Sequence, residues 1–373
     1  AEGWLMKKNA TASSVPILII IVAIIFITII LIEFHPYLLG YFDNKRNLKE
    51  VNLIPRYEKI ISMMKTPLPE IPEESKILDV TIFYTPHATC YLDSRASIAN
   101  YLENTSYDEF VWYSRPFEFK YLGENGEIRS GIGGGEQTVE AFYNLGYKAY
   151  TGNTAGRFPP VIFMRHETAD NNYIFFKTQE EAFDFIKKLI SSGIPVAITF
   201  KGDFSLIAGY NKTHVFTIPY KDTETGEYIS GIDKYPLFYE EAAKSKKYQA
   251  LTTKQFFNFW KTGGNSFTWF EKANERKTKE EMFEINRQDA IKAAENSKRF
   301  AQNPIMRSYT SDGDGTIFTA GASRYLKKQG YGELADKYME ISTAYNERAA
   351  KNKMISYSEI AKLYEEAAEM FDE

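Results

Sequence analysis

Cysteine and histidine are scarce in this chain, and their scarcity excludes several kinds of site. Cys90 is the one cysteine in 373 residues, so an intrachain disulfide cannot form. The four histidines show no metal-ligand spacing, and we expect neither a metal nor another cofactor; they are His35, His87, His166 and His214. Basic residues form no stripe or tail and the net charge is only −4, so a nucleic-acid partner is not expected.

The strongest signal that is present is an uninterrupted apolar run near the start of the chain. Residues Val15–Ile32, VPILIIIVAIIFITIILI, carry no charge and just reach the length that spans about 30 Å of hydrocarbon as a helix. We predict a short tail over residues 1–14, a transmembrane helix over residues 15–34, and therefore a single-pass membrane protein. Long domains translocate largely regardless of charge, so the large C-terminal part is expected outside the cytoplasm. A cleaved signal peptide is the alternative for this run.

The rest of the chain divides by composition into a linker, a mixed region and a helical region. Residues 35–75 are expected to form a juxtamembrane stalk, and its last part, Thr66–Ser75, has the three prolines and three glutamates typical of an extended linker. Strand and helix patterns follow one another over residues 76–235, which predicts an α+β domain. Helical patterns prevail from about Ala242, and we predict a helical extension over residues 236–373. No pattern specifies an oligomeric state.

A strand followed by a helix surrounds the single cysteine. The alternation in KILDVTIFY (Lys76–Tyr84) predicts a strand. The next helix is expected to begin at Cys90, with Leu92, Ile98 and Tyr101 on its buried face. Cys90 then has two alternative roles: a nucleophile, or a small apolar residue that packs in the first turn of a core helix.

A second unit of helix and strand leads into a hairpin. Thr178 can cap a helix that Gly193 ends, and a strand follows it in GIPVAITF. The segments FSLIAGYN and HVFTIPY, separated only by KT, indicate an antiparallel hairpin that turns near Lys212. In this hairpin Asp203 is expected to pair close to Ile218.

The order of these elements resembles the papain-like fold of the C39-like peptidases. A cysteine begins a helix, and GIPV (Gly193–Val196) and GY (Gly209–Tyr210) match the family's pattern. The tail GTIFTAGASRYLKKQGYGELADKYMEISTAYNERAA is similar to the helical extension that follows BtrH-type acyltransferase-like domains. The resemblance covers residues 76–373. With the apolar run, it implies an α+β chain with an N-terminal transmembrane helix, a papain-like (C39-like) cysteine-peptidase fold and an α-helical C-terminal region.

The family's chemistry requires a cysteine thiolate with partners around it. A helix N-terminus lowers the pKa of the thiol, a histidine oriented by a carboxylate or amide takes its proton, and an upstream glutamine stabilises the oxyanion. The resemblance places Asp203 at the family's histidine position, Tyr84 at its glutamine position and Ile218 at its aspartate position. Of the catalytic residues, only Cys90 matches.

Four side chains are candidates for the role of the missing histidine, and one of them, His166, lies in a separate segment that the sequence pattern does not place. Asp203 could accept a hydrogen bond, but a carboxylate beside a thiolate would raise the pKa of the cysteine. His87 lies three residues before Cys90 and could approach it as a base. His214 is expected near the hairpin turn, about 13 Å along the strand from the level of Asp203 and too far to share a proton with Cys90.

Two functions remain open on these grounds. The first is a membrane-anchored cysteine peptidase or acyltransferase-family domain outside the cytoplasm, degenerate in its catalytic partners, that would act through a thioester on Cys90. The second is a non-catalytic binding or structural subunit of a membrane or cell-surface assembly. The expected partners are the membrane, through residues 15–34, and a peptide or protein ligand. Whether the chain is an enzyme stays open, because fold does not determine function.

Overall fold

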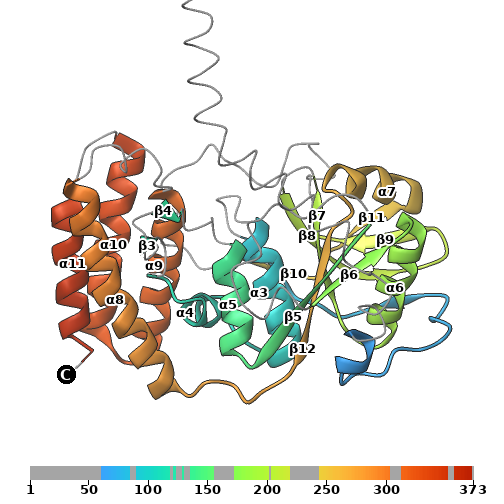
Figure 1. Ribbon diagram of the computed structural model, residues 1–373, viewed down its shortest axis with the longest axis horizontal. Coiled ribbons are helices and arrows are strands. Elements are labelled where there is room, and N and C mark those ends of the chain that lie inside the picture. Colours follow the sequence, from blue (N-terminus) through green and yellow to red (C-terminus); the bar gives the residue numbers. More distant parts are fainter. Residues whose placement is uncertain are drawn as a thin grey trace, which may run out of the picture. The chain divides into compact units, whose positions relative to one another are not determined.

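The fold was analysed in a computed structural model, which describes most of the chain after residue 59 (Figure 1). The described residues are 60–84, 90–117, 121–122, 128–129, 135–154, 172–200, 203–218, 243–302, 312–351 and 357–371. They belong to one compact unit that comprises residues 56–373. The predicted transmembrane segment, residues 15–34, and the candidate base His87 lie outside the described residues.

The described strands form one mixed sheet and two short ribbons. The sheet has eight strands, in the order β11-β9-β8-β7-β12-β5-β6, and β1 pairs with β8 beside this path. Its strands are β1 (Lys76–Ile77), β5 (Tyr147–Thr154), β6 (Tyr173–Phe176), β7 (Val196–Phe200), β8 (Asp203–Tyr210), β9 (His214–Thr217), β11 (Gln249–Thr252) and β12 (Phe267–Lys272). The ribbons pair β2 (Ile82–Tyr84) with β10 (Ala243–Ser245) and β3 (Tyr121–Leu122) with β4 (Ile128–Arg129). The β5–β6 pair is parallel and the other pairs are antiparallel, which makes the sheet mixed.

The described helices fall into two groups along the chain. Those that accompany the strands are α3 (Cys90–Glu103), α4 (Tyr107–Tyr113), α5 (Gly135–Asn144), α6 (Gln179–Ser191) and α7 (Thr253–Thr262). Those that follow the last strand are α8 (Lys279–Gln302), α9 (Asp312–Lys328), α10 (Gly332–Lys351) and α11 (Tyr357–Glu369). The second group packs together into a helical region, shown in orange and red in Figure 1.

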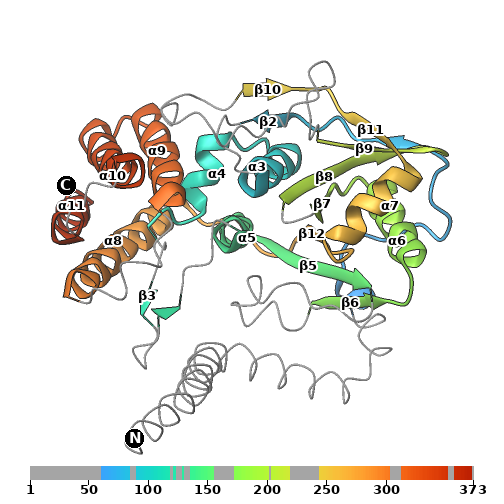
Figure 2. The same cartoon turned by 90° about the horizontal axis from the view of Figure 1, so that it is seen from above.

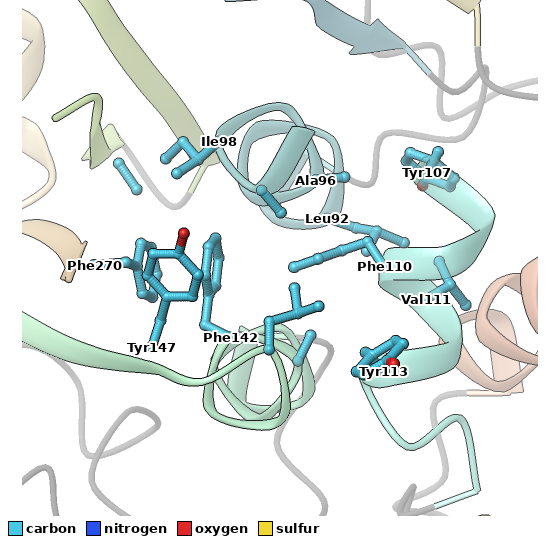
Figure 3. Packing of buried hydrophobic residues seen from close by; sticks show 14 of the residues in the cluster. Leu92, Ala96, Ile98, Tyr107, Phe110, Val111, Tyr113, Phe142, Tyr147 and Phe270 are labelled. Carbon is cyan, nitrogen blue, oxygen red and sulfur yellow. The ribbon is translucent and has the colours of Figure 1, made fainter. Parts of the chain in front are cut away.

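Helices cover both faces of the sheet. Successive residues of a strand face opposite sides. On β12, Phe270 stacks on Phe142 of α5 with ring centroids 3.5 Å apart, whereas Trp269 contacts Phe185 of α6 at 5.3 Å. Figure 2 shows the resulting layers, with α3 and α5 on one side of the strands and α6 and α7 on the other. Figure 3 shows the core on the first side, where Phe110 of α4 and Phe142 meet with centroids 5.3 Å apart.

The second helix–strand unit and the hairpin form where the sequence predicts them. The Thr178 hydroxyl accepts a hydrogen bond from the backbone N–H of Glu181, which caps α6. Gly193 ends this helix with φ of +83°, a conformation that glycine adopts without strain. β8 and β9 then pair antiparallel, so the predicted hairpin is confirmed.

The prediction that the chain is helical from Ala242 onward is wrong for its first part. β10, β11 and β12 all lie in this stretch, with α7 between the last two. β12 occupies an inner position of the main sheet, between β7 and β5. The aromatic run FTWFEK is typical of a strand that is buried on both faces, where a helical period would not satisfy its neighbours.

Helix α4 joins the sheet region to the helical region. This seven-residue helix begins with a capping box between Ser106 and Glu109, and it is almost entirely buried. Trp112, which is fully buried, contacts rings from the helical region at centroid distances between 5.3 and 6.4 Å. These rings are Phe283, Tyr325, Tyr338 and Phe371. We call this packing the α4 joint.

Buried ion pairs reinforce the α4 joint. Just after α4, Arg115 binds Asp289 of α8 through two hydrogen bonds of 2.8 Å, and it also reaches Glu140 of α5 at 3.0 Å. Within α4, Asp108 is 3% exposed and accepts hydrogen bonds from Arg324 of α9 at 2.8 and 2.9 Å. The two-point geometry of the Arg115–Asp289 pair specifies orientation as well as proximity.

We expect Gly321→Ala to destabilise the α4 joint by about 1–3 kcal/mol, because a Cβ there would lie 2.8 Å from a methyl of Val111. The matched control is Gly332→Ala at the start of α10, where an added Cβ meets nothing within 4 Å. Thermal unfolding monitored by circular dichroism measures both variants. Equal melting temperatures for the two variants would contradict the close approach of α9 to α4.

The predicted fold class needs a correction. Among the residues that the structure describes, no helix is long and apolar enough to cross a membrane. The 24-residue α8, for example, carries charged residues along its whole length and packs in the helical region. The structure supports an α+β fold with a mixed sheet, and not the predicted arrangement headed by a transmembrane helix. The location of the protein at a membrane stays a prediction from residues outside the described ranges.

Candidate functional site

Helix α3 begins at Cys90, as the sequence predicts, and its first turns lie against β8. Tyr91 contacts the ring of Phe204 with centroids 6.1 Å apart. Asp203 is the first residue of β8 and immediately precedes Phe204. The backbone therefore brings the candidate nucleophile and the residue at the family's histidine position to the ends of two neighbouring elements.

The other side of α3 packs on β2, which carries the third candidate residue. The Ser97 hydroxyl accepts a hydrogen bond of 2.9 Å from the backbone N–H of Phe83. Tyr84, the next residue, ends β2, and residues 85–89 connect it to Cys90. Tyr84 thus ends the stretch predicted as one strand, Lys76–Tyr84, which the structure divides into β1 and β2.

Among the described side chains of β8, the ring of Phe204 contacts the first turns of α3. Besides Tyr91, this ring contacts the guanidinium of Arg95, whose central carbon lies 5.4 Å from the ring centroid. An aromatic ring can pack against a thiol, but it cannot accept the proton that a nucleophilic cysteine must lose. The contacts of Phe204 with α3 are therefore aromatic and cation–π contacts.

Arg95 places a positive charge inside the protein, five residues or about one and a half helical turns beyond Cys90. It is 1% exposed, stacks on Phe204 and donates a short hydrogen bond to the Thr138 hydroxyl of α5. A guanidinium keeps its charge when buried and cannot act as a base at physiological pH. Arg95 therefore acts on its surroundings electrostatically and by packing, not by proton transfer.

Other polar side chains on α3 are used to hold neighbouring elements. The Asp93 carboxylate accepts a hydrogen bond of 3.1 Å from the Tyr107 hydroxyl at the start of α4. The Ser97 hydroxyl donates to the backbone carbonyl of Asp93 at 2.7 Å while it accepts from β2. These hydrogen bonds offset the desolvation of the buried Asp93 and Ser97 side chains.

The predicted pairing of Asp203 with Ile218 is wrong by about three residues. Ile207 pairs with Thr217, and extending this register by one residue places Ile218 opposite Leu206. Ile218 is a partly buried apolar residue packed against the core. It cannot supply the carboxylate or amide that orients a histidine in the family.

His214 lies at the turn end of the hairpin, as predicted. It begins β9, and its backbone N–H donates to the Asn211 side-chain oxygen at 2.7 Å, which fixes the turn. Its ring Nδ1 lies 2.8 Å from the Thr213 hydroxyl. Asp203 stands at the opposite end of β8, roughly 23 Å away along seven residues of strand. His214 therefore cannot share a proton with a residue at the start of α3.

Sequence reasoning identified part of the buried face of α3 and missed its polar members. Leu92 and Ile98 are fully buried as expected, whereas Tyr101 is only partly buried. Arg95 and Phe204 were not predicted as neighbours. One signal in the sequence could have indicated that Tyr91 and Arg95 contact the same neighbour: they lie four residues apart and so on the same side of a helix.

The described residues contain no group of three His, Cys, Asp or Glu side chains that could hold a metal ion.

Comparisons with known proteins identified no relative of this chain. The chain matches no protein-family model, no curated protein and no solved structure. The resemblance to the C39-like peptidases rests on the residues of this chain alone.

Proposed function

We propose that this protein is a non-catalytic binding domain, derived from a cysteine peptidase or acyltransferase of the C39-like kind, whose ligand is a peptide or another protein. The contact of Phe204 with Tyr91 and Arg95 carries this proposal, because it puts an aromatic ring and a guanidinium beside the first turns of α3. In an active cysteine enzyme this neighbourhood supplies a base.

The chemical argument concerns proton transfer. A thiol becomes a nucleophile when a base lies within hydrogen-bond reach, about 2.6–3.2 Å, and is itself held in place by a third group. The Phe204 ring has no lone pair for this purpose, and Arg95 is already protonated. The residue at the family's third position, Ile218, is apolar. The described parts of this chain thus support binding better than acyl transfer.

One observation favours the alternative, an active enzyme that uses Cys90. The cysteine begins a 14-residue helix, where free N–H groups and the helix dipole lower the pKa of a thiol. Arg95 adds a positive charge about one and a half turns away, and a positive charge also lowers the pKa of a thiol. The base would then have to come from a residue such as His87, which stays a prediction.

We expect the pH profile of Cys90 alkylation by iodoacetamide in the folded protein to be unchanged in His87→Ala, because no histidine base activates the thiol in a binding domain. Because the chain has a single cysteine, the reaction reports on this thiol alone. The measurement is the alkylation rate between pH 5 and pH 9, with the unfolded protein as reference and Cys90→Ser as the unlabelled control. A rate that titrates well below pH 8, and that shifts in His87→Ala, would establish the enzyme instead.

A second readout tests acyl transfer directly. After incubation with a panel of peptide thioesters, intact-mass spectrometry of the wild type is expected to show no acyl adduct that Cys90→Ser lacks. Binding of unmodified peptides, measured by fluorescence anisotropy, is expected to be the same in both proteins. An adduct confined to the wild type would overturn the binding proposal.

A further inference from the structure

Residues 66–77 lie on the surface of the sheet domain, and we call them the strap. The strap contains the three prolines of the predicted linker and ends as β1, which pairs antiparallel with the end of β8. None of its residues is buried. Ile71 and Ile77, two of its apolar residues, are 86% and 51% exposed. The side chains of the strap therefore contribute little to the core.

Two hydroxyl groups of the domain bind the main chain of one strap residue. The backbone N–H of Glu73 donates to the Ser191 hydroxyl at 3.3 Å, and the Tyr210 hydroxyl donates to the Glu73 carbonyl at 2.8 Å. The two hydroxyl oxygens lie 2.6 Å apart, so Ser191 donates to Tyr210. A neighbouring strand binds both main-chain groups of a residue in the same way. The hydroxyl pair thus recognises an extended main chain and not a particular side chain.

The other contacts of the strap are a further main-chain bond, an exposed ion pair and one apolar anchor. The Ser192 hydroxyl, just after α6, donates to the carbonyl of Pro67 at 3.2 Å. The Glu74 carboxylate lies 2.9 Å from the Lys212 ammonium, but these side chains are 79% and 72% exposed, so the pair contributes little to the free energy of attachment. Leu68 is partly buried and packs against the core.

Gly209 leaves room for the strap on β8. A Cβ added at this position would lie 2.5 Å from the carbonyl oxygen of Lys76 and 2.7 Å from the Cα of Ile77, and the third atom nearest to it also belongs to Ile77. The missing side chain therefore accommodates the backbone of the strap. We call the groups that hold the strap the seat: Ser191, Ser192, Gly209 and Tyr210.

We propose that the seat is a peptide-binding site that the strap occupies as an internal ligand, and that an extended, acidic, proline-containing segment of another protein binds there in its place. This inference deepens the proposed binding function and rests on it. Recognition of the main chain admits an extended segment of another chain, as in the addition of a strand to a sheet. Prolines keep such a segment extended before it binds, and the charge of Lys212 favours acidic residues in it.

The strap can leave the seat without dismantling the core. Its release uncovers Leu68, which is only partly buried, and segments with few buried apolar contacts open at a low cost in free energy. The hydroxyls of Ser191 and Tyr210 keep their bond to each other when Glu73 leaves. The seat therefore stays assembled, and the strap and the incoming segment compete for the same groups.

Binding of a labelled synthetic peptide with the sequence of residues 66–77, TPLPEIPEESKI, tests this inference in the full chain by fluorescence anisotropy. The wild type is expected to bind the peptide weakly, because its own strap fills the seat. Leu68→Asp removes the apolar anchor of the strap and is expected to bind the peptide about tenfold more tightly, since more seats are open. Glu70→Gln, at an exposed strap position, is the matched control and is expected to bind as the wild type.

Two further changes show whether the peptide binds at the seat. Gly209→Ala displaces the strap and blocks the seat, so hydrogen exchange of the strap is expected to accelerate while the peptide is not bound. A peptide methylated on the backbone nitrogen that corresponds to Glu73 lacks the N–H that donates to Ser191. This peptide is expected to bind Leu68→Asp severalfold more weakly than the unmethylated one.

Binding by Leu68→Asp that is no tighter than binding by the wild type would overturn the inference, as would equal binding of the methylated peptide. If Leu68→Asp does not fold, the wild type decides the question. An excess of unlabelled peptide must then accelerate hydrogen exchange of the wild-type strap, and unchanged exchange would overturn the inference. Acylation of Cys90 would instead overturn the non-catalytic function and leave these binding results as they are, so the two failures are distinguishable.

Discussion

Trp112→Ala is expected to lower the free energy of unfolding by about 3–5 kcal/mol, the usual cost of removing a large buried ring. Trp112 is fully buried in the α4 joint and contacts one ring from each of α8, α9 and α10, and a fourth just after α11. Alanine would leave a cavity at the centre of these contacts. The helical region and the sheet region would then lose their main apolar connection together.

Urea unfolding followed by far-ultraviolet circular dichroism measures this effect. The matched control is Phe259→Ala on α7, where the residue is 45% exposed and the change in the free energy of unfolding is expected to stay within about 0.5 kcal/mol. Trp112→Phe is expected to lie between the two, because it keeps a ring and the Trp112 Nε1 has no partner among the described residues. A loss below about 1 kcal/mol for Trp112→Ala would contradict the central place of this residue in the joint.

Arg115→Ala is expected to cost a similar amount, about 3–5 kcal/mol, for an electrostatic reason. The substitution removes both hydrogen bonds to Asp289, whose side chain is only 2% exposed. A buried carboxylate without its cation is strongly unfavourable, because water cannot reach it to replace the lost bonds.

Two further variants separate the charge effect from packing. Arg115→Lys keeps the charge but not the two-point geometry, so an intermediate loss is expected. The double variant Arg115→Met with Asp289→Leu removes the Asp289 pair as a whole and is expected to recover part of the loss, while the buried Glu140 still lacks its partner. All variants keep a side chain at position 115, where φ is +60°, so backbone strain cancels between them. A double variant as unstable as Arg115→Ala would show that the ion pair is not the cause.

Local signals in the sequence were sufficient for some elements and not for others. The cap at Thr178 and the glycine at 193 place α6, because both act within a few residues. β12 was missed because its partners, β5 and β7, lie far away in the sequence. Nothing within the run FTWFEK says that it lies inside a sheet, and the helical segments on either side favoured the wrong interpretation.

In the candidate site, too, local sequence signals predicted some features, while contacts between distant residues could not be predicted. The start of α3 at Cys90 follows from the local pattern and is confirmed. The contact between Arg95 and Phe204 joins residues more than a hundred positions apart, and it depends on how α3 crosses β8. The pairing of Ile218 failed for a related reason, since the hairpin register depends on which residues form the turn and on a bulge between Ile207 and Gly209.

The α4 joint also determines where this chain can be divided. A protein that ended after β12 would keep every described strand, yet it would expose Trp112 and leave Arg115 without its α8 partner. The helical region alone would lack the ring that its four aromatic side chains enclose. Neither piece is therefore expected to be soluble by itself. The helical region is a second half of one folding unit, and a gain or loss of that region in a related protein would require a matching change in α4.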